Sequence, residues 1–391
     1  MIPAILEWEG VVIASSVKQD LLERTIGHRA GPAGHVYIYN PTSSTHLGTH
    51  TWSPVHASAT WQGAQRTARM LTTGRRPTNG AADGDFWAAA AGELLAPILL
   101  AAAHADRTMA DVMRWLKRQE HDEIIDILTA AGEDSAVDST DANSAREQRQ
   151  RSSIYTTAEL ALQVFQDPAV LASAATCQIT PDRLLDGRAN TLYLCGPTHE
   201  QDRVRPLLET LLEQIIAEIN NRAAQGTPPA QPILLVLDEA ANIAAPPHLD
   251  ALLSTAAALG VQVITVWQDL AQLHARYGPQ RAQTILNNSR ARIVLSGISD
   301  TTTLDEVGRL LGDTTVTQPH ITHDANGGTS TGEGVTYRPL APADLLRQLP
   351  PNEGLLIYGH LPPVRIRLRP WWRDRALTQR QAGTQPVAQK G

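Results

Sequence analysis

Residues 232–239 read Pro-Ile-Leu-Leu-Val-Leu-Asp-Glu, a run of aliphatic residues that ends in two acids. The aliphatic run predicts a strand of a parallel sheet that is covered by helices on both faces. Asp238 and Glu239 would then stand at the carboxyl end of the strand, which is the edge of an α/β sheet where ligands bind. A first acid in that place can hold Mg²⁺, and a second can orient and deprotonate an attacking water. The structural alternative is that the acids cap the following helix and interact with its dipole.

The next predicted strand also runs into a polar residue at the same edge. Residues 261–268 read Val-Gln-Val-Ile-Thr-Val-Trp-Gln. The neutral amide of Gln268 could touch a γ-phosphate or the attacking water and report hydrolysis to the next element. Alternatively, Gln268 is a surface residue that caps a helix over 269–277.

The other half of a nucleotide site is missing from the sequence. A P-loop needs a glycine-rich turn whose amides cradle phosphate, followed by Lys and by Ser or Thr. The chain has three lysines, Lys18, Lys117 and Lys390, and none of them is followed by Ser or Thr. We therefore expect the catalytic acids without the residues that grip phosphate.

Composition limits the class of protein. The chain has 391 residues, 42% of them hydrophobic and 19% charged, with a net charge of −7. These values are typical of a soluble globular protein with two or three domains, and the negative charge argues against a generally basic nucleic-acid coat. Two cysteines, Cys177 and Cys195, are too few for a disulfide framework or a thiolate metal cluster. The most apolar stretch, 94–103, is far shorter than the ~20 residues that span a bilayer, so it predicts a core helix and no transmembrane segment.

Strand-like runs alternate with helical patterns along the chain, which predicts an α/β fold. Apolar residues three and four apart predict several helices between the second and third strands, so we expect an inserted, mostly helical domain over 80–188. Its polar middle, 132–153, is interpreted as a surface loop or disordered linker. The strand candidates are 10–14, 35–39, 191–195, 233–237, 261–266, 291–295 and 355–358.

Five stretches follow or surround the two acids, namely 235–242, 252–260, 268–278, 284–288 and 292–297, with further segments at 11–22, 39–41, 52–54, 191–197 and 304–312. Together these stretches resemble TraG/TraD-type conjugative coupling proteins, the RecA-like motor ATPases of type IV secretion within the FtsK/HerA group.

The resemblance implies a RecA-like, mostly parallel sheet flanked by helices, with an inserted helical domain associated with substrate recognition. It implies ATP and Mg²⁺ as cofactors, homo-hexameric assembly, and work at the cytoplasmic face of the inner or cell membrane. The implied partners are DNA, relaxosome and relaxase proteins, and type IV secretion channel components. The expected domains are a first motor part at 1–79, the insertion at 80–188, the remaining motor part at 189–372, and a disordered basic tail at 373–391.

The resemblance also places a Walker A loop immediately before the segment corresponding to 2–15. The sequence is thus expected to be a truncated, split or misassigned version, or else a shortened paralogue. This chain alone is therefore expected not to hydrolyse ATP. Two alternative functions stay open: a non-catalytic adaptor that recruits substrates through its helical domain, and an FtsK/HerA-like DNA translocase outside secretion.

Cationic residues supply two further candidate sites. An arginine finger acts between subunits by stabilising charge on the transferred phosphoryl group. Arg290 and Arg292, which precede or begin a predicted strand, are the candidates, and Arg276 and Arg281 stay open as further candidates. For any one of them, a solvated surface charge is the favoured alternative. Near the carboxyl terminus, Arg365, Arg367 and Arg369 alternate along a predicted strand face, followed by Trp371 and Trp372. This pattern is compatible with nucleic-acid or partner contact, but it favours a solvated edge strand with a basic tail.

Overall fold

The computed structural model describes residues 1–391 except 17–19, 32, 44–45, 74–81, 324–328 and 383–391. Contacts divide the chain into two compact units. Unit 1 comprises Met1–Val266 and Asp374–Gly391, and unit 2 comprises Trp267–Arg373. Each unit is described by itself.

Unit 1 is built on a five-stranded sheet in which every neighbouring pair is parallel. The order β2-β3-β1-β4-β5 places β1 and β4 side by side inside the sheet and β5 at one edge. Aliphatic residues fill the inner strands, and β3 and β4 are buried along their whole length, as the sequence pattern predicts. The strands are β1 (Val11–Ser16), β2 (Val36–Tyr39), β3 (Thr191–Cys195), β4 (Ile233–Leu237) and β5 (Val261–Thr265).

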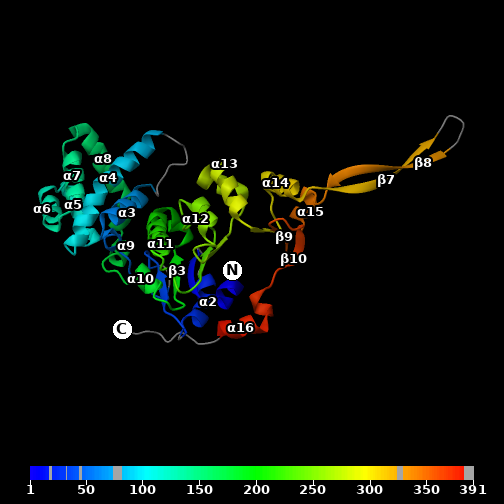
Figure 1. Ribbon diagram of the computed structural model, residues 1–391, viewed down its shortest axis with the longest axis horizontal. Coiled ribbons are helices and arrows are strands. Elements are labelled where there is room, and N and C mark those ends of the chain that lie inside the picture. The colour runs from blue at the N-terminus through cyan, green and yellow to red at the C-terminus, as the bar shows by residue number, and fades with distance from the viewer. Residues whose placement is uncertain (17–19, 32, 44–45, 74–81, 324–328, 383–391) are drawn as a thin grey trace. The chain divides into compact units, whose positions relative to one another are not determined.

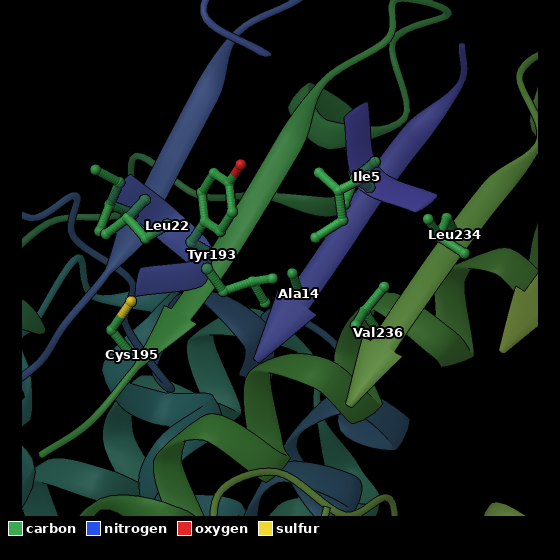
Figure 2. Close-up of a cluster of buried hydrophobic side chains, with 10 residues drawn as sticks. Ile5, Ala14, Leu22, Tyr193, Cys195, Leu234 and Val236 are labelled. Carbon is green, nitrogen blue, oxygen red and sulfur yellow. The ribbon is translucent and has the colours of Figure 1, made fainter. Parts of the chain in front are cut away.

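Helices cover both faces of this sheet. Figure 2 shows one face, where Ile5 and Leu22 lie over strands that carry Tyr193, Ala14 and Val236. These side chains come from α1 (Ile2–Glu7) and α2 (Asp20–Arg29). The other face is covered by α11 (Gln201–Ala224) and α12 (Leu249–Thr255), which line an apolar cavity together with β1, β4 and β5.

A bundle of helices is inserted between β2 and β3 (Figure 1). Its centre is α4, whose stretch Gly84–His104 is, among the described helices, long and apolar enough to cross a membrane. Most of that stretch is buried, because α3, α5, α6, α7 and α8 all pack on α4, so the predicted core helix is confirmed. The helices are α3 (Trp61–Thr73), α4 (Ala82–His104), α5 (Met109–Arg118), α6 (Asp122–Ala131), α7 (Asp134–Ser144), α8 (Gln148–Ala161), α9 (Pro168–Ser173) and α10 (Pro181–Leu184).

The interpretation of 132–153 as a loop or disordered linker is wrong. This segment forms α7 and the first six of the 14 residues of α8. The buried side of α7 consists of Ala136, Thr140 and Asn143, whose spacing of four and three is helical but whose side chains are small or polar. The pattern of hydrophobic residues therefore did not indicate a helix in this segment. The expected domain boundaries at 80 and 188 stay a prediction.

Unit 2 has a second sheet with a different topology. The predicted strands at 291–295 and 355–358 exist as β6 and β9, but they pair antiparallel in a three-stranded sheet of order β10-β9-β6 rather than joining the parallel sheet. Two strands that the sequence did not indicate, β7 and β8, form a separate hairpin. The elements are α13 (Leu270–Asn288), β6 (Ala291–Leu295), α14 (Thr301–Leu311), β7 (Asp313–His323), β8 (Thr329–Pro339), α15 (Ala343–Arg347), β9 (Glu353–Tyr358) and β10 (Val364–Arg367).

The expectation of a disordered tail at 373–391 is also wrong in its first part. Residues 375–382 form α16 (Arg375–Ala382), which packs on α1 and α2 of unit 1. Leu377 is fully buried there, and the Arg380 guanidinium donates a hydrogen bond of 2.8 Å to the Leu6 carbonyl. The rest of the tail, 383–391, lies outside the described residues.

Candidate functional site

Asp238 and Glu239 lie directly after β4, at the carboxyl edge of the parallel sheet, as predicted. The Asp238 amide donates to the Ser15 carbonyl of β1 at 3.2 Å, and the Ala240 amide donates to the Val266 carbonyl after β5 at 3.1 Å. The backbone around the two acids is thus tied to the strands on both sides. Both side chains are half-buried.

The two acids do not cap a helix. Residues 239–242 form a turn, and the next helix, α12, begins only at Leu249 with His248 at its amino-terminal cap. The Glu239 backbone is left-handed, with φ +48°. For a residue with a Cβ this conformation costs about 1–2 kcal/mol. The turn is closed by Asn242, whose amide donates to the Glu239 carbonyl at 2.8 Å and whose side-chain Nδ2 donates to Glu239 Oε2 at 3.2 Å. The Glu239 carboxylate is therefore held in place.

Negative charge is concentrated at Asp238. Burial raises the pKa of its carboxyl above the ordinary value, and the neighbouring carboxylates of Glu239 and Asp20 raise it further, which outweighs the lowering by a hydrogen bond from the Glu239 backbone and by the Met1 ammonium. Asp20 begins α2, so it approaches from a different element. A site that opposes its own ionisation in this way gains free energy from a bound cation.

These carboxylates suit a magnesium ion that takes only part of its ligands from the protein. Among the residues that the structure describes, no group of three or more His, Cys, Asp or Glu side chains could hold a metal ion. Mg²⁺ normally uses one or two carboxylates and takes its other ligands from water and substrate phosphates. Asp238, with its raised pKa and hard oxygen atoms, fits such a role. A Gly-Lys-Ser/Thr loop to grip those phosphates is absent from the 391 residues.

Gln268 belongs to unit 2 and is exposed just before α13. Its backbone amide donates to Gln272 Oε1, and the Gln272 side chain donates back to Gln268 Oε1, both at 3.2 Å. The cap of α13 is Asp269, whose carboxylate accepts from the Gln272 amide at 2.8 Å. Gln268 is thus not the capping residue, and its side chain is oriented by the first turn of α13.

The two candidate arginines, also in unit 2, have different surroundings. Arg292 is half-buried and donates to the Leu286 carbonyl at 2.5 Å, and burial lowers the pKa of its guanidinium. Arg290 is exposed, and its guanidinium lies 5.1 Å from the centre of the Tyr358 ring. Unit 1 therefore brings together Asp238, Glu239 and the unforeseen Asp20, while Gln268 and both arginines are positioned by unit 2.

The family model for type IV secretory system conjugative DNA transfer matches residues 1–390. The chain belongs to this family. VirD4 of Rhizobium radiobacter is 22% identical over 405 residues, which cover 99% of this chain and 57% of that protein. The conjugal transfer protein TraG of the same organism is 23% identical, covering 95% of this chain and 59% of that protein. The chain thus spans somewhat more than half the length of these relatives.

Solved structures support the fold. The bacterial conjugative coupling protein TrwBΔN70 in its unbound form has a TM-score of 0.70 and 17% identity, over 92% of this chain and 78% of that one. TrwB in complex with ADP and Mg²⁺ has a TM-score of 0.69 at 17% identity, with the same coverage. The predicted RecA-like α/β fold of a coupling protein is confirmed.

Proposed function

We propose that this chain carries the magnesium and water half of the nucleotide site of a conjugative coupling motor. The observation that supports this most is the electrostatic arrangement at Asp238, a half-buried carboxylate whose like-charged neighbours oppose its ionisation. The complex of the TrwB protein with ADP and Mg²⁺ is consistent with this role. The family match favours DNA transfer over an adaptor without catalysis or a translocase outside secretion.

The residues of the site have distinct roles in this proposal. Asp238 is a ligand of nucleotide-bound Mg²⁺, which supplies charge neutralisation for phosphoryl transfer when it is present. Glu239 orients and deprotonates the attacking water, and its contact with Asn242 keeps the carboxylate aimed. Gln268 senses the γ-phosphate or the water. Arg290 or Arg292 supplies the arginine finger; the Arg292 guanidinium also donates to the Leu286 carbonyl.

ATP is the proposed fuel, and DNA, with or without an attached relaxase, is the proposed cargo. The motor would act as a homo-hexamer at the cytoplasmic face of the membrane and deliver this cargo to the secretion channel. Because the sequence contains no phosphate-gripping loop, we propose that these 391 residues alone do not hydrolyse ATP.

The test is a mating assay in a host whose conjugative transfer depends on this gene. Glu239→Gln should lower the transfer frequency roughly 100-fold or more, the usual range for loss of a general base. Glu159→Gln, an isosteric change at an exposed position of α8, should leave it unchanged. Equal transfer by both variants would refute the catalytic proposal. Steady ATP hydrolysis by the purified 391-residue chain, lost in Glu239→Gln, would show that the loop is not needed.

A further inference from the structure

Unit 2 extends a long hairpin that has little support of its own. Strands β7 and β8 are each 11 residues long and pair only with each other. Their root packs on α14, and the Leu340 amide donates to the Gly312 carbonyl at 2.9 Å, while the rest runs away from the body of the unit (Figure 1). A two-stranded hairpin is marginally stable in water, and its open edges invite pairing. We call β7 and β8 the arm.

One face of the arm carries two large, exposed apolar side chains, Val335 and Tyr337. Because side chains alternate along a strand, Thr315 and Thr317 share a face with their cross-strand partners Tyr337 and Val335. Tyr337 is 72% exposed and Val335 is 62% exposed. The charged residues on this face, in the part of the arm whose side chains are described, are acidic: Asp313 and Glu333.

The three-stranded sheet of the same unit has an uncovered apolar face. Its other face packs on α14 and α15 through Val294, Leu355 and Ile357. On the uncovered face, Ile293 of β6, Leu356 of β9 and Val364 of β10 form one row across the strands. Ile293 and Val364 are each 53% exposed. We call this surface the open face; its members are Ile293, Leu295, Leu356, Tyr358, Val364 and Ile366.

The open face has a positive end. Arg290 lies over Tyr358 there. Moving along β6 from Arg290, Ile293 lies three residues and Leu295 five residues further on, roughly 17 Å in all at about 3.3 Å per residue. The arm offers the complementary order over a similar length: acidic Glu333, then Val335, then Tyr337. An arm laid along β6 would pair Glu333 with Arg290 and place Val335 on Ile293.

We propose that the open face of one copy of this chain receives the arm of a second copy. Within one copy the arm leaves from its root on α14 and extends away from the unit, so its apolar face is free to meet another molecule. The two surfaces are unlike each other but lie on the same unit. A contact between unlike surfaces of identical chains is head-to-tail, so each copy both gives and receives an arm. This contact rests on the proposed function only in that a coupling motor needs several copies.

Cysteine cross-linking tests the contact without nucleotide. The natural cysteines are a buried Cys195 and a half-buried Cys177, so the background is low. Under mild oxidation, a mixture of Val335→Cys and Ile293→Cys copies should give a covalent mixed dimer. The matched control replaces Val335→Cys by Thr336→Cys, which lies on the opposite face of the arm and is also exposed. Equal cross-linking by the control, or none with Val335→Cys, would overturn the proposal.

Sedimentation velocity then measures the energetic role of the arm. The full chain should associate with increasing concentration, and Val335→Ser with Tyr337→Ser should weaken association at least roughly tenfold. A chain that stays monomeric up to roughly 1 mM, the weak limit of specific association, would refute the contact. The role of Asp238 and Glu239 would be untouched by that result, because the mating assay reports on it separately.

The charge pairing is tested by exchange. Glu333→Arg and Arg290→Glu should each weaken self-association. A mixture of the two variants restores an opposite-charge pair at every arm-to-face contact, so association should recover. A mixture as weak as either variant alone would overturn the proposed register of the arm along β6.

Discussion

Replacing Arg29 with methionine should destabilise unit 1 more than any surface substitution. Arg29 ends α2 and is 7% exposed. Its guanidinium donates to Thr191 Oγ1 at 2.7 Å, to the carbonyls of Trp8 and Gly10 at 2.6 and 2.7 Å, and to the Ala189 carbonyl at 3.0 Å. It thus joins the segments that lead into β1 and β3. No carboxylate is among these four acceptors.

The magnitude follows from these four bonds. Each buried acceptor left without a donor costs about 1–3 kcal/mol. Two effects offset part of that sum: methionine fills the volume of the stem, and a buried charge is removed, whose burial already lowers the pKa of Arg29. The net cost of Arg29→Met should be about 3–5 kcal/mol, the range for breaking a buried charged network. Arg29→Lys should cost less stability than Arg29→Met but should still be destabilising, since one ammonium group has three donors and no planar fork.

Because the chain has two units, a single unfolding free energy is not well defined, and the assay must report on unit 1. Native-state hydrogen exchange of the β1 and β3 amides, followed by mass spectrometry in a urea series, gives the opening free energy of the sheet. Arg24→Met is the matched control, at an exposed position of the same helix. It should change that free energy by about 0.5 kcal/mol or less. An Arg29→Met variant as stable as this control would refute the reasoning.

Three further outcomes are expected. Because the pKa of Asp238 is raised in the folded state, its carboxylate destabilises unit 1 as pH rises through that pKa. Asp238→Asn should therefore raise the melting temperature at pH 7, and the difference from the unsubstituted chain should shrink towards about pH 3.9. An equal difference in melting temperature at both pH values would contradict this. Leu377→Ala should cost about 2–5 kcal/mol of local stability and speed tryptic cleavage within α16, whereas unchanged cleavage would mean that α16 is not held by this side chain. Gly10→Ala should destabilise β1 in the exchange assay, since a Cβ there would lie 2.0 Å from the Pro232 carbonyl, while Gly84→Ala, with nothing within 4 Å, should be neutral or stabilising by up to about 1 kcal/mol.

The parts of the fold that the sequence predicted are those with a strong apolar period. The five strands of unit 1 are short runs rich in aliphatic and aromatic residues, and α4 and α11 bury many apolar side chains. The period does not identify the partner of a strand, so β6 and β9 were assigned to the parallel sheet although they pair with each other. The sequence pattern did not predict the two strands of the arm, because they are rich in threonine and glycine and contain few apolar residues.

The site was predictable to the same extent. Asp238 and Glu239 follow a recognisable strand, so their place at the sheet edge could be derived. Asp20 could not be, because it is distant in sequence and meets Asp238 only through the packing of α2 on the sheet. The left-handed backbone of Glu239 has no sequence signal either, since glycine or asparagine is the usual residue in that conformation. Both are consequences of tertiary structure.

Two unfavourable features coincide at residues 238 and 239, and their coincidence is itself an argument for function. Asp238 ionises against its neighbours, and Glu239 adopts a conformation that asparagine or glycine would adopt at lower cost. A purely structural turn would gain stability from either replacement. Buried charge elsewhere in unit 1 is compensated, as Arg29 shows with its four acceptors. Two such costs at adjacent residues support the proposed roles of Asp238 in holding a cation and of Glu239 in orienting water.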